Sequence, residues 1–300
     1  EVDNLRRCVQ RAFRTFRQPR LMAAMRRAAM LRPSGWEVAG THYIDLYQLH
    51  RIDDAIPMDW FGGDPFKSMV LTALSATFPE GERFFVDSVR HYQKDVSPAL
   101  ARQVSGFIGQ EAHHGREHDA FNAFMQRKGL PMDRIDAFVR DGMKFMRRRL
   151  SPERQLAMTC ALEHFTAILA ELALEHPDFF GPMDERVKPL WYWHAIEENE
   201  HKAVAFDVFQ DRVGSYWIRS SQMLLNTIEF AFFSSFHTWQ LFKARGIQRD
   251  WKMIRRGLDE LVGRKPGWLR KMGKAYLSYY RPDFHPWQRD TTAAMEHWKA

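Results

Sequence analysis

The chain has 300 residues, of which 45% are hydrophobic, and a formal net charge of +7. A chain of this size can bury a sizeable core in one domain with appendages. Its two cysteines, Cys8 and Cys160, provide neither a disulfide framework nor a Cys-x-x-Cys metal knuckle. The sequence has no Gly-x-Ser-x-Gly elbow and no phosphate-binding glycine loop, which argues against serine-hydrolase and nucleotide-dependent chemistry.

Strand signals are sparse throughout the chain, because alternating β-branched runs are few and Asn-Gly turns are missing. The predicted fold is therefore all-α. We divide the chain into a basic amphipathic N-terminal arm (1–40), a helical bundle (41–213) and a C-terminal helical extension (214–300).

The N-terminal arm is dominated by arginine, with nine arginines between Arg6 and Arg32 and no acidic residue among them. Such a patch attracts anionic lipid or nucleic acid. No nucleic-acid-binding fold signature accompanies it, so we expect a solvated or membrane-facing surface and no specific nucleic-acid partner. No apolar stretch followed by a cleavage site occurs at the start, and a cytoplasmic location is expected.

Helical signals fill most of the central segment. Five helices are predicted there: residues 66–94, 98–128, 132–149, 152–175 and 184–213. The third is polar and is expected outside the four that form the core. Pro79 and Gly81 disturb the first helix near its middle, while Ser151 and Pro152 are typical of a helix start.

Two Glu-x-x-His pairs, Glu111/His114 and Glu198/His201, occur within these predicted helices. A separation of three residues is less than one turn, so each pair directs a carboxylate and an imidazole to the same side. Two such helices, with one glutamate from each of two others, can hold two metal ions in a four-helix bundle. The spacing therefore predicts a dinuclear metal centre.

The two further glutamates are Glu82 in FPEGERFF and Glu163 in CALEHFTA. Both lie among apolar neighbours, where an ionised carboxylate costs several kcal/mol unless it is paired or bound to metal. Exposed helix glutamates with incidental histidines are the alternative, which the apolar surroundings disfavour. Glu80 stays open as an alternative to Glu82, because Pro79 obscures the helix phase. The four glutamates Glu82, Glu111, Glu163 and Glu198 are the predicted catalytic groups.

Another histidine, His194, lies one turn before Glu198 and two turns before His201. We expect it to be a third imidazole ligand, with a core histidine bonded to a carbonyl as the alternative. Four neighbouring residues are predicted to hold the ligands in place: Gln110, His118, Glu197 and Tyr192. The alternatives are that His118 is itself a ligand and that Glu197 is a surface acid.

In the C-terminal extension, residues 220–242 are nearly uncharged and long enough to span a bilayer. Glu229 and several other polar residues interrupt this stretch, and polar groups inside lipid are unfavourable. We therefore expect a helix packed on the bundle or lying at a membrane surface, rather than a span.

Several motifs together resemble the bacterial family of predicted metal-dependent hydrolases. They are FPEGERFF, GQEAHHGREHDAFN, ALEHFTA, WYWHAIEENEHKAVAFDVF and YYRPDFHPW, and the resemblance covers roughly residues 42–290. Separately, the ligand pattern resembles ferritin-like di-iron carboxylate proteins, and among them the di-iron arylamine N-oxygenases, which use a third histidine one turn before the last Glu-x-x-His. By motif position the implied ligands are Glu82, Glu111, His114, Glu163, His194, Glu198 and His201.

This resemblance implies two metal ions, with iron expected first and manganese or zinc as alternatives. We favour oxygen-activating oxidation of a small apolar organic substrate, which requires an electron donor. The first alternative is hydrolysis of an ester or amide through a metal-bound water. The second alternative is a non-enzymatic iron-binding bundle. The chain could also form a homodimer, which the sequence leaves open.

Overall fold

The computed structural model describes residues 52–264 and 267–291, which belong to the second of two compact units, His50–Ala300. This described part is all-helical, which confirms the predicted fold class. An isolated antiparallel bridge joins Phe61 to Met183. The predicted basic arm, residues 1–40, lies outside the described residues.

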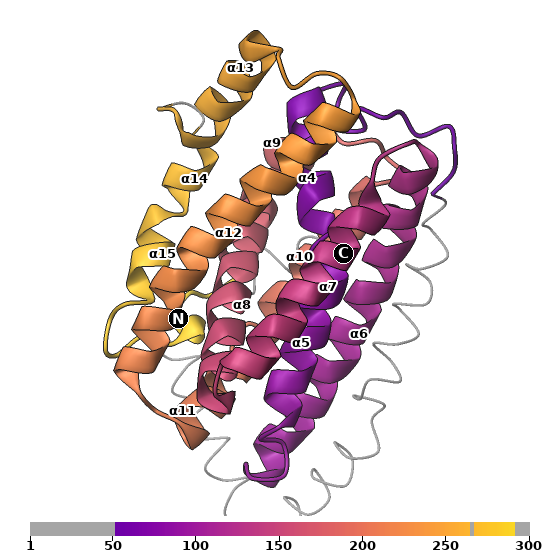
Figure 1. Ribbon diagram of the computed structural model, residues 1–300. Helices are drawn as coiled ribbons and strands as arrows, with labels where there is room; N and C mark the ends of the chain where they lie inside the picture. The colour runs from indigo at the N-terminus through magenta and orange to yellow at the C-terminus, as the bar shows by residue number, and fades with distance from the viewer. Residues whose placement is uncertain (1–51, 265–266, 292–300) are drawn as a thin grey trace, which may run out of the picture. The chain divides into compact units, whose positions relative to one another are not determined.

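Thirteen helical elements follow one another in the described residues (Figure 1). They are α4 (Pro65–Ser75), α5 (Phe78–Arg90), α6 (Pro98–Arg127), α7 (Met132–Arg149), α8 (Pro152–Glu175), α9 (Pro177–Phe180), α10 (Lys188–His201), α11 (Val204–Arg212), α12 (Tyr216–Ala244), α13 (Trp251–Val262), α14 (Trp268–Lys271), α15 (Gly273–Ser278) and the 3-10 helix η1 (Pro286–Gln288).

Two of the predicted helices are each broken into two. The segment 66–94 is α4 and α5, because Pro79 lies in the first turn of α5, where its missing N–H and its fixed φ favour a new helix start over continuation. The segment 184–213 is α10 and α11, with a turn at Lys202 and Ala203 directly after the second Glu-x-x-His. The predictions of single helices there are wrong.

Four helices pack around the centre of the unit. α5 packs on α6 and α8, and α10 packs on α8 and α6, so the four close a ring (Figure 1). α7 lies against α5 and α6, and α12, drawn in orange, lies along α8 and α4. The ring thus places residues from distant parts of the sequence face to face.

Apolar side chains form two buried clusters around these helices. Phe84, Phe107 and Phe209 belong to a buried cluster formed by α5, α6, α8 and α11. A second buried cluster joins α8 and α12 to the C-terminal residues Tyr279 and Phe284. The C-terminal segment therefore packs on the helical unit.

Gly257 lets α13 approach α4 closely. A Cβ atom at this position would overlap the ring of Phe66, which is itself buried. Close packing of this kind leaves no room for an extra methyl group.

We expect Gly257→Ala to lower the free energy of unfolding by about 1–3 kcal/mol through overpacking. Gly109, in the interior of α6, is the matched control, since a Cβ there would meet nothing within 4 Å. Gly109→Ala should leave stability unchanged or raise it by about 0.4–1 kcal/mol. Urea denaturation curves of the two variants provide the comparison, and equal midpoints would contradict the assigned contact.

Candidate metal centre

The ring of four helices brings all seven predicted ligands together in the interior. α5 supplies Glu82, α6 supplies Glu111 and His114, α8 supplies Glu163, and α10 supplies His194, Glu198 and His201. Every one of these side chains is buried. Two groups have donor atoms within 4.8 Å of one another: Glu82, His114 and His194, and Glu111, Glu198 and His201.

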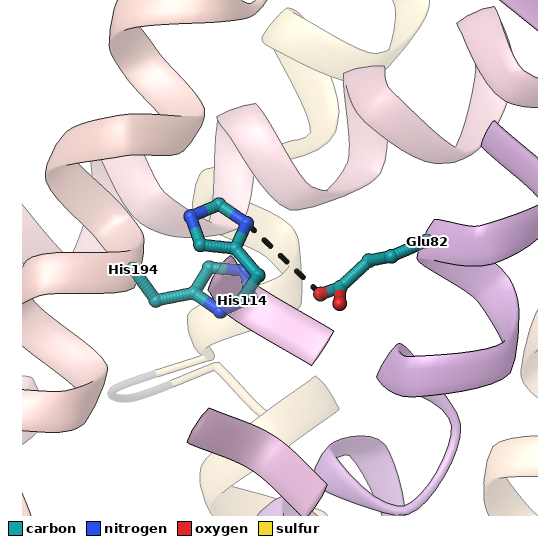
Figure 2. Close-up of side chains that lie close together, drawn as sticks. All are labelled: Glu82, His114 and His194. Carbon is teal, nitrogen blue, oxygen red and sulfur yellow. Dashed lines mark ion pairs between the residues drawn. The ribbon is translucent and has the colours of Figure 1, made fainter. Parts of the chain in front are cut away.

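The first group is built on two stacked imidazoles (Figure 2). The rings of His114 and His194 lie with their centroids 4.2 Å apart and their planes 10° from parallel. Glu82 approaches from α5, with its Oε1 4.0 Å from His114 Nδ1. Two imidazoles and a carboxylate suit a divalent transition metal.

The second group surrounds His201. Its Nε2 atom lies 3.0 Å from Glu111 Oε1, 3.4 Å from Glu163 Oε2 and 3.7 Å from Glu198 Oε2. Glu163 therefore belongs to this side of the centre.

Glu198 faces both groups with its two oxygens. Glu198 Oε1 lies 2.9 Å from His194 Nε2, whereas Oε2 faces His201. Glu111 Oε1 also lies 3.9 Å from His114 Nδ1. The two groups are therefore adjacent, and Glu198 faces both of them.

Burial and neighbouring groups shift the pKa values of the buried cluster in different directions. Burial and the neighbouring carboxylates raise the pKa of Glu82 and of Glu163 well above the usual range. Burial would also raise the pKa of Glu198, but the adjacent imidazoles of His194 and His201 hold it well below its usual value. Burial opposes charge on His201, yet Glu111 and Glu163 raise its pKa. The cluster thus requires positive charge at its centre.

Gln110 determines which ring nitrogen of His201 carries the proton. The amide Nε2 of Gln110 donates to Glu200 Oε2 at 3.0 Å, so its Oε1, 3.1 Å from His201 Nδ1, is the acceptor. His201 Nδ1 must then carry the proton, and its Nε2 presents a lone pair to the carboxylates unless the ring is charged.

A longer hydrogen-bonded chain determines the orientation of His194. Asn122 Nδ2 donates to the Ser75 carbonyl, and Ser75 Oγ donates to Asn122 Oδ1 at 2.8 Å. Ser75 Oγ therefore accepts from His118 Nδ1, 2.8 Å away, and His118 Nε2 accepts from His194 Nδ1 at 2.7 Å. Burial, with the nearby His194 and His114, lowers the pKa of His118 well below its usual value, which keeps it neutral.

As a consequence, imidazole nitrogens that carry lone pairs face carboxylate oxygens, and both are hydrogen-bond acceptors. With its proton on Nδ1, His194 directs the lone pair of Nε2 toward the carboxylate oxygen of Glu198 at 2.9 Å. His114 has Nε2 2.8 Å from Glu197 Oε2, which leaves Nδ1 facing the cluster. The oxygens of Glu82 and Glu163 accept no well-directed hydrogen bond from the described residues. A cation between these atoms removes the repulsion, so the donor set fits bound metal ions.

The remaining predicted residues are placed as follows. Glu80 pairs with Arg83 at 2.7 Å, whereas Glu82 faces His114, so Glu82 is the glutamate at the centre. Tyr192 lies against Phe180, with ring centroids 5.2 Å apart, and its role at the centre stays a prediction.

Several residues at the centre were not foreseen from the sequence. Asn122 lies one turn after His118, so helical spacing could have indicated it. Thr166, three residues after Glu163, donates to Glu198 Oε2 at 2.6 Å and follows the same rule. Ser75 comes from α4, and no local signal connects it to His118, which is 43 residues away in the sequence.

Gly115 explains how α5 and α6 come close enough for Glu82 to reach the centre. A Cβ at Gly115 would lie 3.1 Å from Glu82 Oε2 and 3.7 Å from Pro79 Cα. Any larger residue would press on the carboxylate.

A cavity of about 530 Å³ adjoins the metal centre. Its wall includes Glu82 from one ligand group, Glu198 from the other, and Thr166. The rest of the lining is mainly apolar and comes from α5, α7, α8 and α12, including Phe85, Met143, Met158, Leu162, Phe230 and Phe233. We call this cavity the chamber.

We expect Glu111→Ala to lower the metal content sharply, because Glu111 faces both His201 and His114. Glu117→Ala is the matched control, since Glu117 lies on the same helix, is half-buried and belongs to neither ligand group. Elemental analysis of both purified variants tests the assignment. Two metals retained per chain in Glu111→Ala would contradict it.

Ser75→Ala should weaken metal binding about 10–100-fold, because the variant removes the acceptor that orients His118 and, through it, His194. Ser88→Ala is the control, since Ser88 is also buried but contacts Thr159 at 2.7 Å. Competition of each protein with a metal-binding dye measures the affinity. Equal losses in the two variants would assign the effect to general destabilisation.

Comparison with known proteins gives a family match and short local matches. Glycogen synthase of Xanthomonas oryzae pv. oryzae (strain PXO99A) is 72% identical over 47 residues, which are 16% of this chain and 9% of the synthase. Glycogen synthase of Xanthomonas campestris pv. campestris (strain 8004) is 75% identical over 47 residues, 16% of this chain and 10% of that protein. The chain thus spans about a tenth of these curated relatives. No solved structure matches it significantly.

The family match covers much more of the chain. Residues 48–290 match the family described as predicted metal-dependent hydrolase, and this range contains every proposed ligand. The chain therefore belongs to the predicted metal-dependent hydrolase family.

Proposed function

We propose that this protein is a dinuclear metal-dependent hydrolase that acts on an apolar ester or amide. The observation that carries the proposal is the wall of the chamber, which contains Glu82 and Glu198, one glutamate from each ligand group. A substrate in the chamber would therefore meet the metal-binding carboxylates directly. Family membership favours the same class of reaction.

The seven ligands would hold two divalent ions in a ferritin-like four-helix arrangement. Bound there, the ions would lower the pKa of a water molecule and polarise the carbonyl of the substrate. The apolar lining of the chamber would exclude bulk water and orient the acyl portion of the substrate.

Two chamber residues have defined parts in this proposal. Thr166 donates its hydroxyl proton to Glu198 Oε2 at 2.6 Å, which orients that carboxylate at the chamber wall. Glu82 lies at the chamber wall as well, so a metal ion held by its carboxylate would be next to a substrate in the chamber.

Oxygen-activating oxidation is the second candidate, and the donor set is the observation that favours it. Four glutamates and three histidines projecting from helices suit iron or manganese and resemble di-iron carboxylate proteins. This reaction needs an electron donor as partner. The chamber argues for a small-molecule substrate in either case, and against iron storage alone.

A series of p-nitrophenyl esters of increasing acyl length, tested with metal-loaded protein, distinguishes the candidates. The proposal predicts hydrolysis that is lost on chelation. If the metal-loaded protein hydrolysed the esters no faster than the metal-free protein, the hydrolase proposal would be rejected. In that case, two irons per chain and new near-ultraviolet absorption when the ferrous form meets oxygen would select the oxidation reaction.

Gly142→Leu should lower kcat/KM for a long-chain ester by about tenfold or more, because the new side chain would occupy part of the chamber. Gly142 lines the chamber, and a Cβ there would meet nothing within 4 Å. The kcat/KM for the acetyl ester and the metal content should be unchanged. Lys144→Leu, at an exposed position of the same helix, is the control. Equal effects on short and long esters would contradict the assigned binding site.

A further inference from the structure

α12 presents an apolar face to solvent along most of its length. Nine residues between Trp217 and Trp239 are exposed: Trp217, Leu224, Leu225, Ile228, Ala231, Phe232, Ser235, Phe236 and Trp239. None of them is charged, and their spacing of three, four and seven residues places them on one side of the helix. Trp217 is 79% exposed and Phe232 62%. The stripe is about 33 Å long at 1.5 Å per residue.

The exposed stripe is continuous with the opening of the chamber. Phe138 of α7 is 45% exposed, and its ring lies 5.6 Å from Phe233 and 5.7 Å from Phe236 of α12. Ile228 and Phe232 belong to the stripe and also line the chamber. Since these residues are both exposed and part of the lining, the chamber opens on this face.

Basic residues border the apolar surface at two places. At the end of α7, the guanidinium of Arg149 lies over the Phe145 ring at 5.5 Å, and Arg148 beside it is exposed. At the end of α12, Trp239 contacts Trp251 at 6.4 Å, next to the exposed Lys243 and Lys252. The uncharged stripe of α12, with cations at its margins, complements an anionic lipid surface.

We propose that this face of α7 and α12 docks on an anionic lipid bilayer, with α12 lying along the membrane surface. Resting on the proposed function, we also assign the substrate class: a long-chain apolar ester or amide that enters the chamber from the bilayer. In the described part of the chain, only α8 is long and apolar enough to cross a membrane, and 78% of its apolar window is buried inside the structure. α12 therefore docks by its exposed face.

Two properties favour a membrane over a second copy of the chain. The bordering cations of one copy would meet like charges in a symmetric dimer, because a two-fold interface pairs the same patch with itself. Anionic lipid headgroups instead attract Lys and Arg side chains near the membrane surface. Large apolar side chains surrounding a chamber mouth would also give a membrane-derived substrate a path that avoids water.

Co-sedimentation of the full chain with vesicles tests the docking face. We expect binding to phosphatidylcholine vesicles containing phosphatidylglycerol, weaker binding to phosphatidylcholine alone, and a loss on the order of tenfold for Trp239→Glu. Trp287→Glu is the matched control, since Trp287 is 48% exposed against 41% for Trp239 but belongs to the C-terminal tail. It should bind as the unaltered protein does.

Unchanged vesicle binding of Trp239→Glu would overturn the proposal, because attachment would then lie elsewhere on the chain. Equal binding to neutral and anionic vesicles would also overturn it. A dimer in light scattering that Trp239→Glu dissociates, without vesicle binding, would assign the face to a second copy instead. Metal content and acetyl-ester hydrolysis of Trp239→Glu should stay normal, so failure of docking is distinguishable from failure of the proposed chemistry.

Discussion

The burial of four carboxylates and three imidazoles in one cluster is the constraint on which the rest of this structure depends. Burying an isolated ionised carboxylate costs several kcal/mol, and here several are held together. In the absence of metal, protons must supply the compensating charge, which is why the pKa values of Glu82 and Glu163 are raised. Metal binding and stability are coupled by the same electrostatics.

Hydrogen bonds from outside the cluster decide where the lone pairs point. A backbone carbonyl of α4 orients the amide of Asn122. The orientation of this amide fixes the donor and acceptor roles of Ser75, then of His118, and finally of His194. Glu200 orients Gln110, and Gln110 orients His201. α4 therefore contributes to the centre although it supplies no ligand. The same helix packs on α12, which connects the metal centre to the helix that lines the chamber.

The chamber and the exposed apolar face are both formed in part by α12. α12 directs Met223, Leu241 and Phe242 into the core, while Leu225, Phe232 and Trp239 remain exposed. Its intermediate positions, including Glu229 and Phe233, line the chamber. Burial raises the pKa of Glu229, which is a mark of the low polarity of this wall. An apolar entrance, an apolar chamber and a polar metal centre thus follow one another.

Local spacing was sufficient to predict much of this protein. The all-helical fold, the helices 132–149 and 152–175, and the pairing of Glu111 with His114 and of Glu198 with His201 follow from helical periodicity, which acts within a few residues. The positions of the breaks before α5 and after α10 were missed. Only the tertiary structure decided that Glu82 rather than Glu80 faces His114. It also decided that Ser75 supports His118, that one cavity touches both ligand groups, and that the uncharged residues of α12 form an exposed face. These features depend on contacts between helices distant in sequence, and no local pattern encodes them.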